Sequence, residues 1–513
     1  MNRRAGLLLP LFSIRTSRGW GLGEIPDLVP FAAWARDAGF SLVQMLPVNQ
    51  PSSGQDSPYA AMSAFALDPM FLSLDACQDF QEAGGEASLS VERALLLQRV
   101  RSAQAVSWRD VRPLKEHGLR AAFASFESKH WLPGTARAQA LRDYARAQGE
   151  WLDPFVLFKA LHDERDAAWT AWEPALARRE PEALEAQRQR LERELRYLTW
   201  LQWQLDVQWR AARAQVAKLG VQLMGDLPFV VAGDSADVWA RQSEFRLDAR
   251  AGVPPDAFSA DGQDWGLPVF LWKTMAQNDL AWFRARGHRA AELFDSFRVD
   301  HVVGLYRTYH RFPDGRAEFS PAQEPDQLAN GERVLRVLAE RAEVIAEDLG
   351  VVPDFVRTSL TRLDVPGYRV LRWEKDGTTF RDPLAWPALS VAVSGTHDTC
   401  ALASWFDEMD VEERRAFLEL PSLAALRAAA PTQFDLGVRD ALLSLLYGSG
   451  SARVLLPLQD ALGTRERVNV PGTVADSNWT YRMPQSVAEL AADAANTARL
   501  RALARQSNRL AAP

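Results

Sequence analysis

The sequence predicts an α/β protein, a (β/α)8 TIM barrel with large, mainly helical insertions, and three observations lead to this fold class. Eight short apolar segments have the length and composition of strands, and several are near-continuous apolar runs, as in parallel strands covered on both faces. Most of these segments are separated by stretches with helical periodicity. Three of them have an acidic residue at or just after their carboxyl end, which is how a parallel barrel assembles a site at one rim.

The eight expected strands span, in chain order, residues 6–11, 41–48, 222–229, 296–301, 344–349, 368–373, 390–396 and 452–458. An open, doubly wound sheet is the alternative arrangement of such units. It would bring a nucleotide crevice, but the glycines of residues 19–24 lack the G-x-G-x-x-G spacing and no acidic residue ends the second strand. The closed barrel is therefore preferred, over residues 1–484.

Two further segments are expected outside the barrel strands. More than 170 residues separate the second strand from the third, which is far beyond an ordinary connection. Residues 76–220 are therefore expected to form a mainly helical insertion, within which residues 180–219 carry apolar residues at helical spacing. Residues 485–513 are expected to form a C-terminal amphipathic helix.

Composition narrows the class of function. Hydrophobic residues make up 47% and charged residues 24%, which is ordinary globular usage and argues against wholesale disorder. The net charge of -7 comes without a long Lys/Arg block, so we expect no nucleic-acid partner, and a neutral or weakly charged ligand fits better. No apolar stretch approaches the roughly 20 residues of a membrane span, so no membrane association is expected.

Cysteine usage and the first residues bear on localisation. The two cysteines, Cys77 and Cys400, are too few for a disulfide framework or a cysteine metal site, which is typical of a reducing cytoplasm. The apolar start at Leu7 imitates a signal peptide, but Pro10 and Arg15 interrupt it. We therefore interpret this start as the first strand and expect a cytoplasmic protein.

The chemistry is expected at Asp300, Glu347 and Asp398, which end three separate apolar runs. Arg298 and Asp300 are two apart on a strand and share a face, and a neighbouring cation lowers a carboxylate pKa, as a nucleophile requires. Glu347 follows apolar residues that favour its protonated form. Opposed roles for two carboxylates are what retaining glycoside chemistry needs, and Asp398 is placed to bind sugar hydroxyls.

Strand-end acids can also have structural roles. A single strand-end acid often caps a helix or joins a structural ion pair, but three in barrel order favour chemistry. The sequence contains no G-x-S-x-G elbow, no H-E-x-x-H and no phosphate-binding G-x-x-x-x-G-K-[ST], so hydrolases of those types are not expected.

The ordered motifs resemble one family. The chain is similar over nearly its whole length to the 4-alpha-glucanotransferases, also called amylomaltases or disproportionating enzymes, of glycoside hydrolase family 77. The motifs are Asp56-Ser57-Pro58-Tyr59, Gly225-Asp226-Leu227-Pro228, Gly252-Val253-Pro254-Pro255-Asp256-Ala257-Phe258-Ser259, Trp265-Gly266, Arg298-Val299-Asp300-His301, Ala346-Glu347-Asp348-Leu349-Gly350, Thr396-His397-Asp398-Thr399 and Asn469-Val470-Pro471-Gly472-Thr473. Each motif alone is weak, whereas the ordered set is highly specific.

The resemblance implies a role for each matching position. Asp300 would be the nucleophile, Glu347 the general acid/base and Asp398 the transition-state stabiliser. The implied substrate-binding residues are Tyr59, Ser57, Asp226, Phe258, Trp265, Arg298, His301, His397 and Asn469.

The resemblance also implies an α-amylase-like barrel without a C-terminal β-sandwich domain, which needs no metal or other cofactor. Residues 250–272 would form an irregular exposed loop that covers the cleft. The implied partners are α-1,4-glucans and maltooligosaccharides, and the oligomeric state, monomer or homodimer, is left open.

Three departures from the family pattern leave subsite preference open. Val302 and Val303 follow His301, where the family usually has Phe-Arg. Leu267 stands where a polar residue usually follows Trp-Gly. Phe319-Ser320-Pro321 and Gln323-Glu324-Pro325 replace an expected Trp and Gly-Pro-Gly pattern.

We therefore expect a 4-alpha-glucanotransferase, a retaining transglycosylase that moves a glucan segment to the 4-hydroxyl of another glucan or glucose. An amylase-type hydrolase and a non-catalytic glucan-binding protein are the alternatives, because fold does not fix function.

Overall fold

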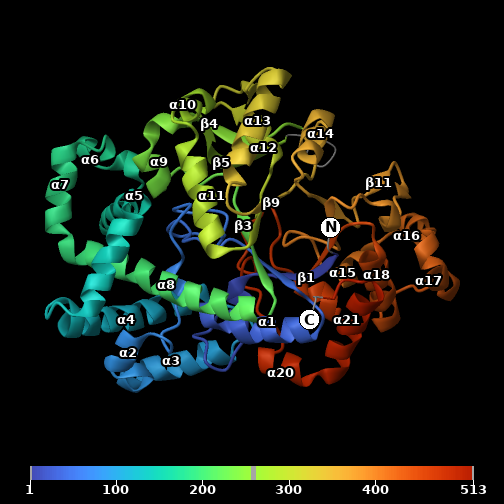
Figure 1. The fold of residues 1–513 in the computed structure, drawn as a ribbon, viewed down its shortest axis with the longest axis horizontal. Helices are drawn as coiled ribbons and strands as arrows, with labels where there is room; N and C mark the ends of the chain where they lie inside the picture. The colour runs from blue at the N-terminus through green and yellow to red at the C-terminus, as the bar shows by residue number, and fades with distance from the viewer. Residues whose placement is uncertain (1–2, 256–261, 511–513) are drawn as a thin grey trace.

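A closed barrel of eight parallel strands lies at the centre of the computed structural model, which describes residues 3–255 and 262–510 (Figure 1). The strands pair in the order β1-β14-β13-β10-β9-β6-β3-β2 and then close. Their bounds are β1 Arg4–Leu9, β2 Leu42–Met45, β3 Gln222–Leu227, β6 Ser296–Val299, β9 Glu343–Ala346, β10 Gly367–Val370, β13 Ser390–Val393 and β14 Arg453–Pro457. Every barrel strand falls on a segment expected to be a strand, so the predicted fold class is confirmed.

The near-continuous apolar character of these strands follows from their surroundings. All four residues of β2, of β6 and of β13 are buried, because one face of each strand fills the barrel and the other is covered by helices. The few polar side chains that point inward therefore reduce the stability of the fold, and they indicate positions with a functional role.

The chain between β2 and β3 is helical, and most of its helices lie together at the left of the barrel in Figure 1. These helices are α2 Gln78–Glu82, α3 Val91–Ser102, α4 Trp108–Phe126, α5 Ala136–Arg165, α6 Pro174–Ala177, α7 Pro181–Arg190 and α8 Glu192–Lys218. The amphipathic pattern over 180–219 belongs to two helices, because Leu191 leaves helical geometry at φ -101° and ψ 13°. Its side chain packs against the core and separates α7 from α8.

A second sheet covers part of the barrel, with the antiparallel order β5-β4-β7-β8. Its strands are β4 Phe245–Val253, β5 Gln263–Phe270, β7 Thr308–Arg311 and β8 Ala317–Ser320. The expectation of an irregular loop over 250–272 is therefore wrong for its described residues: β4 pairs with both β5 and β7, and these ladders satisfy its backbone groups. Residues 256–261, which include Phe258, lie outside the described residues.

The single C-terminal helix expected over 485–513 is also two helices, α20 Val487–Ala492 and α21 Ala494–Gln506. Asp493 separates them, because its side chain accepts the Asn496 N–H (3.0 Å) and so begins a new helix. Residues 458–510 contain helices and loops and no further strand.

The other elements connect the barrel strands. They are α1 Leu28–Asp37, α9 Ala236–Ala240, α10 Trp272–Gln277, α11 Ala281–Leu293, α12 Val303–Tyr306, α13 Glu324–Leu338, α14 Asp354–Arg362, the hairpin β11 Lys375–Asp376 and β12 Thr379–Phe380, α15 Leu402–Glu408, α16 Val411–Leu418, α17 Ala424–Ala429, α18 Leu436–Gly448 and α19 Leu458–Leu462.

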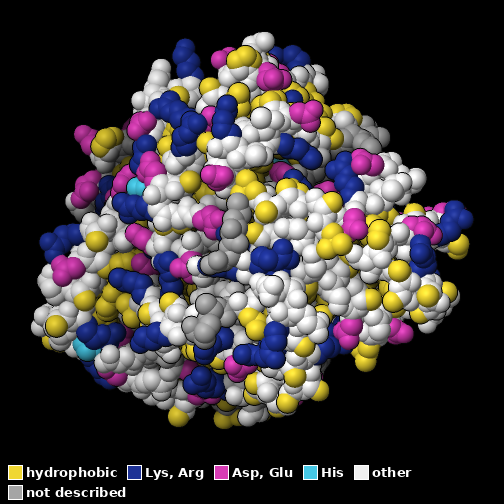
Figure 2. Space-filling view, turned by 45° about the vertical axis from the view of Figure 1, so that its right-hand side comes forward, with side chains coloured by type: hydrophobic (Ala, Val, Ile, Leu, Met, Phe, Trp, Pro, Cys, Tyr) yellow, Lys and Arg dark blue, Asp and Glu magenta, His cyan; other side chains and the backbone are white. Residues whose placement is uncertain are grey.

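The surface mixes both signs of charge. Figure 2 shows Lys and Arg side chains interspersed with Asp and Glu over the visible face. None of the helices in the described ranges is long and apolar enough to cross a membrane.

Candidate active site

Asp300 and Glu347 lie next to each other because the strands they follow, β6 and β9, are paired. The Asp300 N–H donates to the Leu227 carbonyl (3.0 Å), and the Glu347 N–H donates to the Val299 carbonyl (3.0 Å). Glu347 Oε2 in turn accepts the backbone N–H of His301 (2.8 Å). The two carboxylates are thus fixed on adjacent strand ends of one rim.

Arg298 connects Asp300 to a second, deeper acid. One guanidinium nitrogen, Nη2, donates to Asp300 Oδ1 (2.7 Å), while Nη1 lies 2.8 Å from each carboxylate oxygen of Asp226. Burial disfavours the charged guanidinium, yet Asp226 and Asp300 outweigh this and raise the pKa of Arg298. A permanent cation therefore holds the Asp300 carboxylate, as expected from their shared strand face.

Glu347 is in the opposite electrostatic situation. Burial, reinforced by the charge of Asp300, raises its pKa to about 7, although Arg298 and the His301 N–H act in the other direction. At neutral pH this carboxyl group can hold or release a proton, whereas Asp300 is paired with a cation. The two acids are therefore suited to different tasks.

His301 adopts a strained backbone conformation, with φ at 46°, which is uncommon for a residue with a side chain. This turn aims its N–H at Glu347. The imidazole packs edge-on against Trp265 of β5 (ring centroids 4.8 Å apart) and against Phe229 (5.5 Å). Burial lowers the pKa of His301 to about 4, so its ring is neutral at neutral pH.

Asp398 lies in the loop after β13 and is held from two sides. Asn469 Nδ2 donates to Asp398 Oδ1 (2.6 Å), and His397 Nε2 lies 3.4 Å from the same oxygen. The loop is tight at Gly395, where an added Cβ would come within 2.3 Å of Thr399 Oγ1. About a third of the Asp398 side chain (38%) remains exposed, so it can still meet a ligand.

Tyr59 joins the Asp398 group to the Asp300 group. Its hydroxyl donates to Asp226 Oδ2 (2.6 Å) and lies 3.4 Å from His397 Nδ1. The phenol ring stacks on the His397 imidazole, with centroids 4.8 Å apart and planes 15° apart. One connected network therefore runs from Asp398 through His397, Tyr59 and Arg298 to Asp300.

The structure brings most of the sequence-predicted site residues together. Ser57 does not join the hydrogen bonds of the acids, and its hydroxyl oxygen accepts the Tyr59 backbone N–H (3.3 Å). Phe258 lies outside the described residues. The predicted site residues that are joined by hydrogen bonds or ring contacts are Tyr59, Asp226, Trp265, Arg298, Asp300, His301, Glu347, His397, Asp398 and Asn469.

Four residues of this region are absent from the site predicted from the sequence, although Trp479 belongs to a sequence motif that resembles the family. Arg467 donates to the Asp398 carbonyl (2.5 Å), and Trp479 lies 5.9 Å from the His397 ring. Gln44 and Tyr368 are buried together beneath Arg298 and hydrogen-bond to each other (2.8 Å). Gln44 carried a signal, since it is a polar residue between apolar ones in a fully buried strand.

Within the described ranges, Asp79, Glu82 and His130 bring potential metal-binding atoms within 4.8 Å of one another. Asp79 is already occupied, because Arg137 donates to both of its oxygens and the Trp200 indole N–H donates to it as well (3.1 Å). We therefore assign this group to the ion pairs that join α2 to the neighbouring helices.

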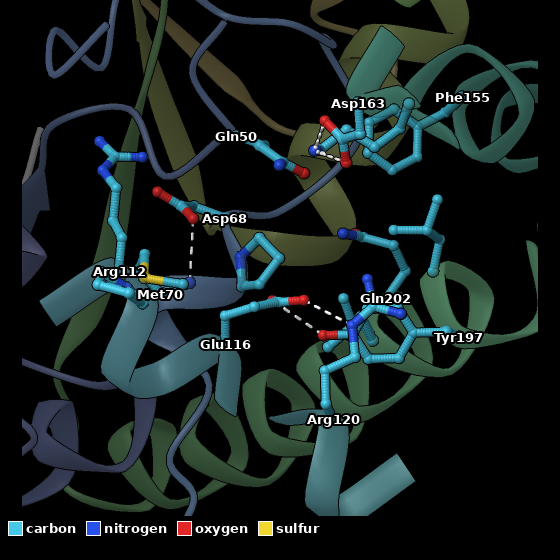
Figure 3. Close-up of a pocket in the computed structure, with 15 residues that line it drawn as sticks. Gln50, Asp68, Met70, Arg112, Glu116, Arg120, Phe155, Asp163, Tyr197 and Gln202 are labelled. Atoms are coloured by element: carbon cyan, nitrogen blue, oxygen red, sulfur yellow. Dashed lines mark hydrogen bonds and ion pairs between the residues drawn. The ribbon is translucent and has the colours of Figure 1, made fainter. Parts of the chain in front are cut away.

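A cavity of about 390 Å³ lies between α4, α5, α8 and the chain that follows β2 (Figure 3). None of the three predicted catalytic acids lines it. Its cations are already paired: Arg112 with Asp56, Arg120 with Glu116 and Glu194, and Lys159 with Asp163. The paired charges make this cavity a poor site for an anion.

Comparison with known proteins identifies the family. The sequence model described as "4-alpha-glucanotransferase", glycoside hydrolase family 77, matches residues 9–488. A 4-alpha-glucanotransferase of Synechocystis sp. is 32% identical over 501 residues, covering 94% of each chain, and one of Chlamydia pneumoniae is 30% identical over 505 residues, covering 95% of this chain and 92% of the relative.

Solved structures agree with this assignment. An amylomaltase from Streptococcus agalactiae in complex with acarbose superposes with a TM-score of 0.85 at 25% identity, covering 99% of this chain and 100% of that one. The amylomaltase of Corynebacterium glutamicum shares the fold, with a TM-score of 0.78 at 21% identity over 98% of this chain and 75% of its own. The expected resemblance, and with it the expected class of enzyme, is confirmed. The chain belongs to the 4-alpha-glucanotransferases of glycoside hydrolase family 77.

Proposed function

We propose that this protein is a retaining transglycosylase that transfers a segment of an α-1,4-glucan to the 4-hydroxyl of another glucan or of glucose. The observation that carries the proposal is the contrast between its two central carboxylates. Asp300 is bound by the buried cation Arg298, while burial raises the pKa of Glu347 to about 7. Such a pair separates the nucleophile from the acid/base.

In the first step, an Asp300 oxygen attacks the anomeric carbon of the glucosyl unit at the bond to be cleaved. Protonated Glu347 gives its proton to the departing 4-oxygen, so the leaving glucan departs as a neutral alcohol. The donor segment remains on Asp300 as a β-linked ester, and Glu347 is left as a carboxylate.

In the second step, the 4-hydroxyl of an acceptor sugar attacks the same carbon. Glu347 takes the hydroxyl proton, the ester bond to Asp300 breaks, and Asp300 returns to its ionised form. Two inversions restore the α-linkage, and each group regains its starting protonation state.

The surrounding polar groups suit a sugar. Asp398, supported by Asn469 and His397, offers a carboxylate to hydroxyls of the distorted ring. The face of Trp265, on the β4–β5 hairpin that would border the cleft, suits the apolar side of a glucose ring. The helical region 76–220 and the C-terminal helices would support the barrel without touching the reacting bond.

The working environment belongs to the proposal as well. Cys77 and Cys400 are both unpaired, and Cys77 is buried. Free thiols fit a reducing compartment such as the cytoplasm, where α-1,4-glucans and maltooligosaccharides would be the substrates.

Incubation with maltotriose tests the proposal. Transfer should release glucose and build a ladder of longer oligomers while the number of reducing ends stays nearly constant, since each cleaved bond is replaced by a new one. A steady rise in reducing ends would instead identify an amylase-type hydrolase. Binding of maltooligosaccharides without any product would identify a non-catalytic glucan-binding protein.

A further inference from the structure

Gln44 is a buried polar residue that lowers the stability of the barrel. It is fully buried in β2, whose other residues Leu42, Val43 and Met45 are buried as well. Its Oε1 accepts a hydrogen bond from the Tyr368 hydroxyl (2.8 Å), but its amide nitrogen has no partner within the described part of the chain. An unsatisfied buried polar group destabilises the fold, and a methionine of similar shape would avoid this cost.

Strand register places Gln44 one layer deeper in the barrel than the active-site cation. Gln44 pairs with Met224 of β3, whereas Asp226, two residues further along the same strand, pairs with Arg298. Alternate residues of a strand share a face, so Gln44 belongs to the layer below the Asp226–Arg298 ion pair.

Tyr368 bridges this layer to Arg298. Its backbone N–H donates to the Asp348 carboxylate (2.7 Å), its hydroxyl donates to Gln44, and its ring centroid lies 5.8 Å from the Arg298 guanidinium carbon. Burial raises the pKa of the Tyr368 hydroxyl, which therefore stays a hydrogen-bond donor. Each end of this tyrosine is fixed, and Arg298 faces its ring.

The cavity between these groups is too small for a substrate. It has a volume of about 10 Å³ and is lined by Gln44, Arg298, Tyr368, Thr396 and His397, among others. That volume is at the lower limit for a single water molecule. Gln44 and Tyr368 can therefore affect the site only through the positions of the side chains above them, such as Arg298.

We propose that Gln44 and Tyr368 form a floor beneath Arg298 and are positioning residues for the transfer reaction. The floor fixes the Tyr368 ring, the ring limits the movement of Arg298, and Arg298 aims the carboxylate of Asp300. This inference rests on the proposed role of Asp300 as the nucleophile. Neither floor residue touches the substrate.

Two variants and their combination test the floor. Tyr368→Phe removes the hydroxyl and keeps the ring, and Gln44→Met keeps the shape and removes the amide. Each should lower kcat for maltotriose disproportionation roughly ten-fold with KM within about two-fold, because small misplacements of reacting groups are costly to rate.

The double variant Gln44→Met/Tyr368→Phe separates positioning from stability. Replacing both partners of a buried hydrogen bond by apolar groups is nearly neutral for stability, so the melting temperature should return toward that of the wild type. The low kcat should persist. The double variant should also let Arg298 move away from Glu347. Since Arg298 is the neighbour that most lowers the pKa of Glu347, this pKa should rise and the high-pH limb of kcat/KM should move to higher pH.

Ser390→Ala is the matched control. Ser390 begins β13, is fully buried and shares a hydrogen bond with Ser451 (2.6 Å), so its loss also breaks a buried hydrogen bond in the barrel. The melting temperature of the Ser390→Ala variant should fall while its kcat and pH profile stay unchanged.

The outcomes are distinguishable when wild type and Asp300→Asn are measured in the same assay. If the wild type transfers glucan and Asp300→Asn does not, a double variant with wild-type kcat and an unchanged pH profile overturns the floor alone. If the wild type makes no transfer product, or Asp300→Asn keeps the wild-type rate, the proposed function fails and the floor proposal fails with it.

Discussion

At the scale of single residues, the site divides two chemically similar carboxylates by their neighbours. Asp300 receives a direct hydrogen bond from a buried guanidinium, whereas Glu347, just beyond the end of β9, receives one neutral N–H. Burial is the largest influence on Glu347 and favours its neutral form. The assignment of acid and nucleophile therefore rests on surroundings rather than on residue type.

The raised pKa of Glu347 predicts the pH dependence of transfer. In the proposed mechanism the free enzyme needs Glu347 protonated, so kcat/KM should fall about ten-fold per pH unit above about pH 7, and the fall should fit one titrating group. Initial rates on maltotriose between pH 5 and 9 measure this. A midpoint near pH 4.5 to 5 would mean that Glu347 is not the acid.

The same shift predicts the stability of Glu347→Gln. The folded-state pKa lies above the unfolded one, so the folded protein binds the extra proton, and the contribution present at low pH is lost as pH rises toward 7. The amide variant cannot ionise. Its melting temperature should therefore exceed that of the wild type by roughly 2 °C or more at pH 8, with little difference at pH 4.

Calorimetry or thermal fluorescence at the two pH values measures this difference. Glu343→Gln, on the same strand but exposed, is the control and should show no such pH-dependent gain. A Glu347→Gln variant that is less stable than the wild type at pH 8 would contradict the raised pKa of Glu347.

At the scale of elements, the β4–β5 hairpin contacts the candidate site through Trp265. Trp265 of β5 packs edge-on against His301, the strained residue whose N–H holds Glu347. Val302 and Val303, which depart from the family pattern, are buried at the start of α12 and face away from solvent. Residues of the hairpin are therefore better placed than these valines to decide which acceptors enter.

Trp265→Ala should shift the reaction from transfer toward hydrolysis. Removing the indole exposes His301 and the ester on Asp300 to water, and exclusion of water is what favours a sugar acceptor. The net increase in reducing ends, divided by the amount of glucose formed from maltotriose, should rise several-fold. Leu247→Ala on the exposed side of β4 is the control and should behave as the wild type; an unchanged ratio in Trp265→Ala would exclude this role.

The sequence could predict those parts of the fold and the site that depend on local pattern. Each barrel strand is a short apolar run, and Arg298, Asp300 and Glu347 are next to such runs in the sequence. The breaks at Leu191 and Asp493 depend on one side chain packing or capping in three dimensions. The β4–β7 ladder and the Tyr368–Gln44 bond join residues far apart in the chain, and periodicity carries no information about such pairs.

At the scale of the whole molecule, closure of the barrel depends on the seam between β1 and β14, the first and last strands. Arg509, which follows α21, is fully buried there. Its guanidinium donates to the carbonyls of Tyr447, Ser449, Ser451 and Ala452, and to that of Arg4 in β1 (3.3 Å). The end of the chain thus holds the seam at the rim opposite the active site.

Arg509→Ala should destabilise the fold without changing the chemistry. It removes a buried guanidinium that donates to five carbonyls, of which those of Tyr447, Ser449 and Ala452 keep a second donor from Arg3 or from the Arg4 N–H. We therefore expect a loss of about 2–4 kcal/mol in the free energy of unfolding. Urea denaturation measures this loss, and kcat at 25 °C should stay at the wild-type value. Arg505→Ala, an exposed arginine of α21, is the control; equal stability of the two variants would show that Arg509 does not hold the seam.

The central claim, that Asp300 carries the glucan between donor and acceptor, is tested most directly by trapping the intermediate. The fluoride ion of an α-glucosyl fluoride leaves without help from an acid, so Glu347→Gln can still form the glucosyl-enzyme. Transfer to an acceptor needs Glu347 as the base, so the glucosyl-enzyme should accumulate in this variant. Mass spectrometry of the digested protein should find one added glucosyl unit on the peptide that contains Asp300. An adduct on another residue, or fluoride release without any adduct in Glu347→Gln, would contradict the account.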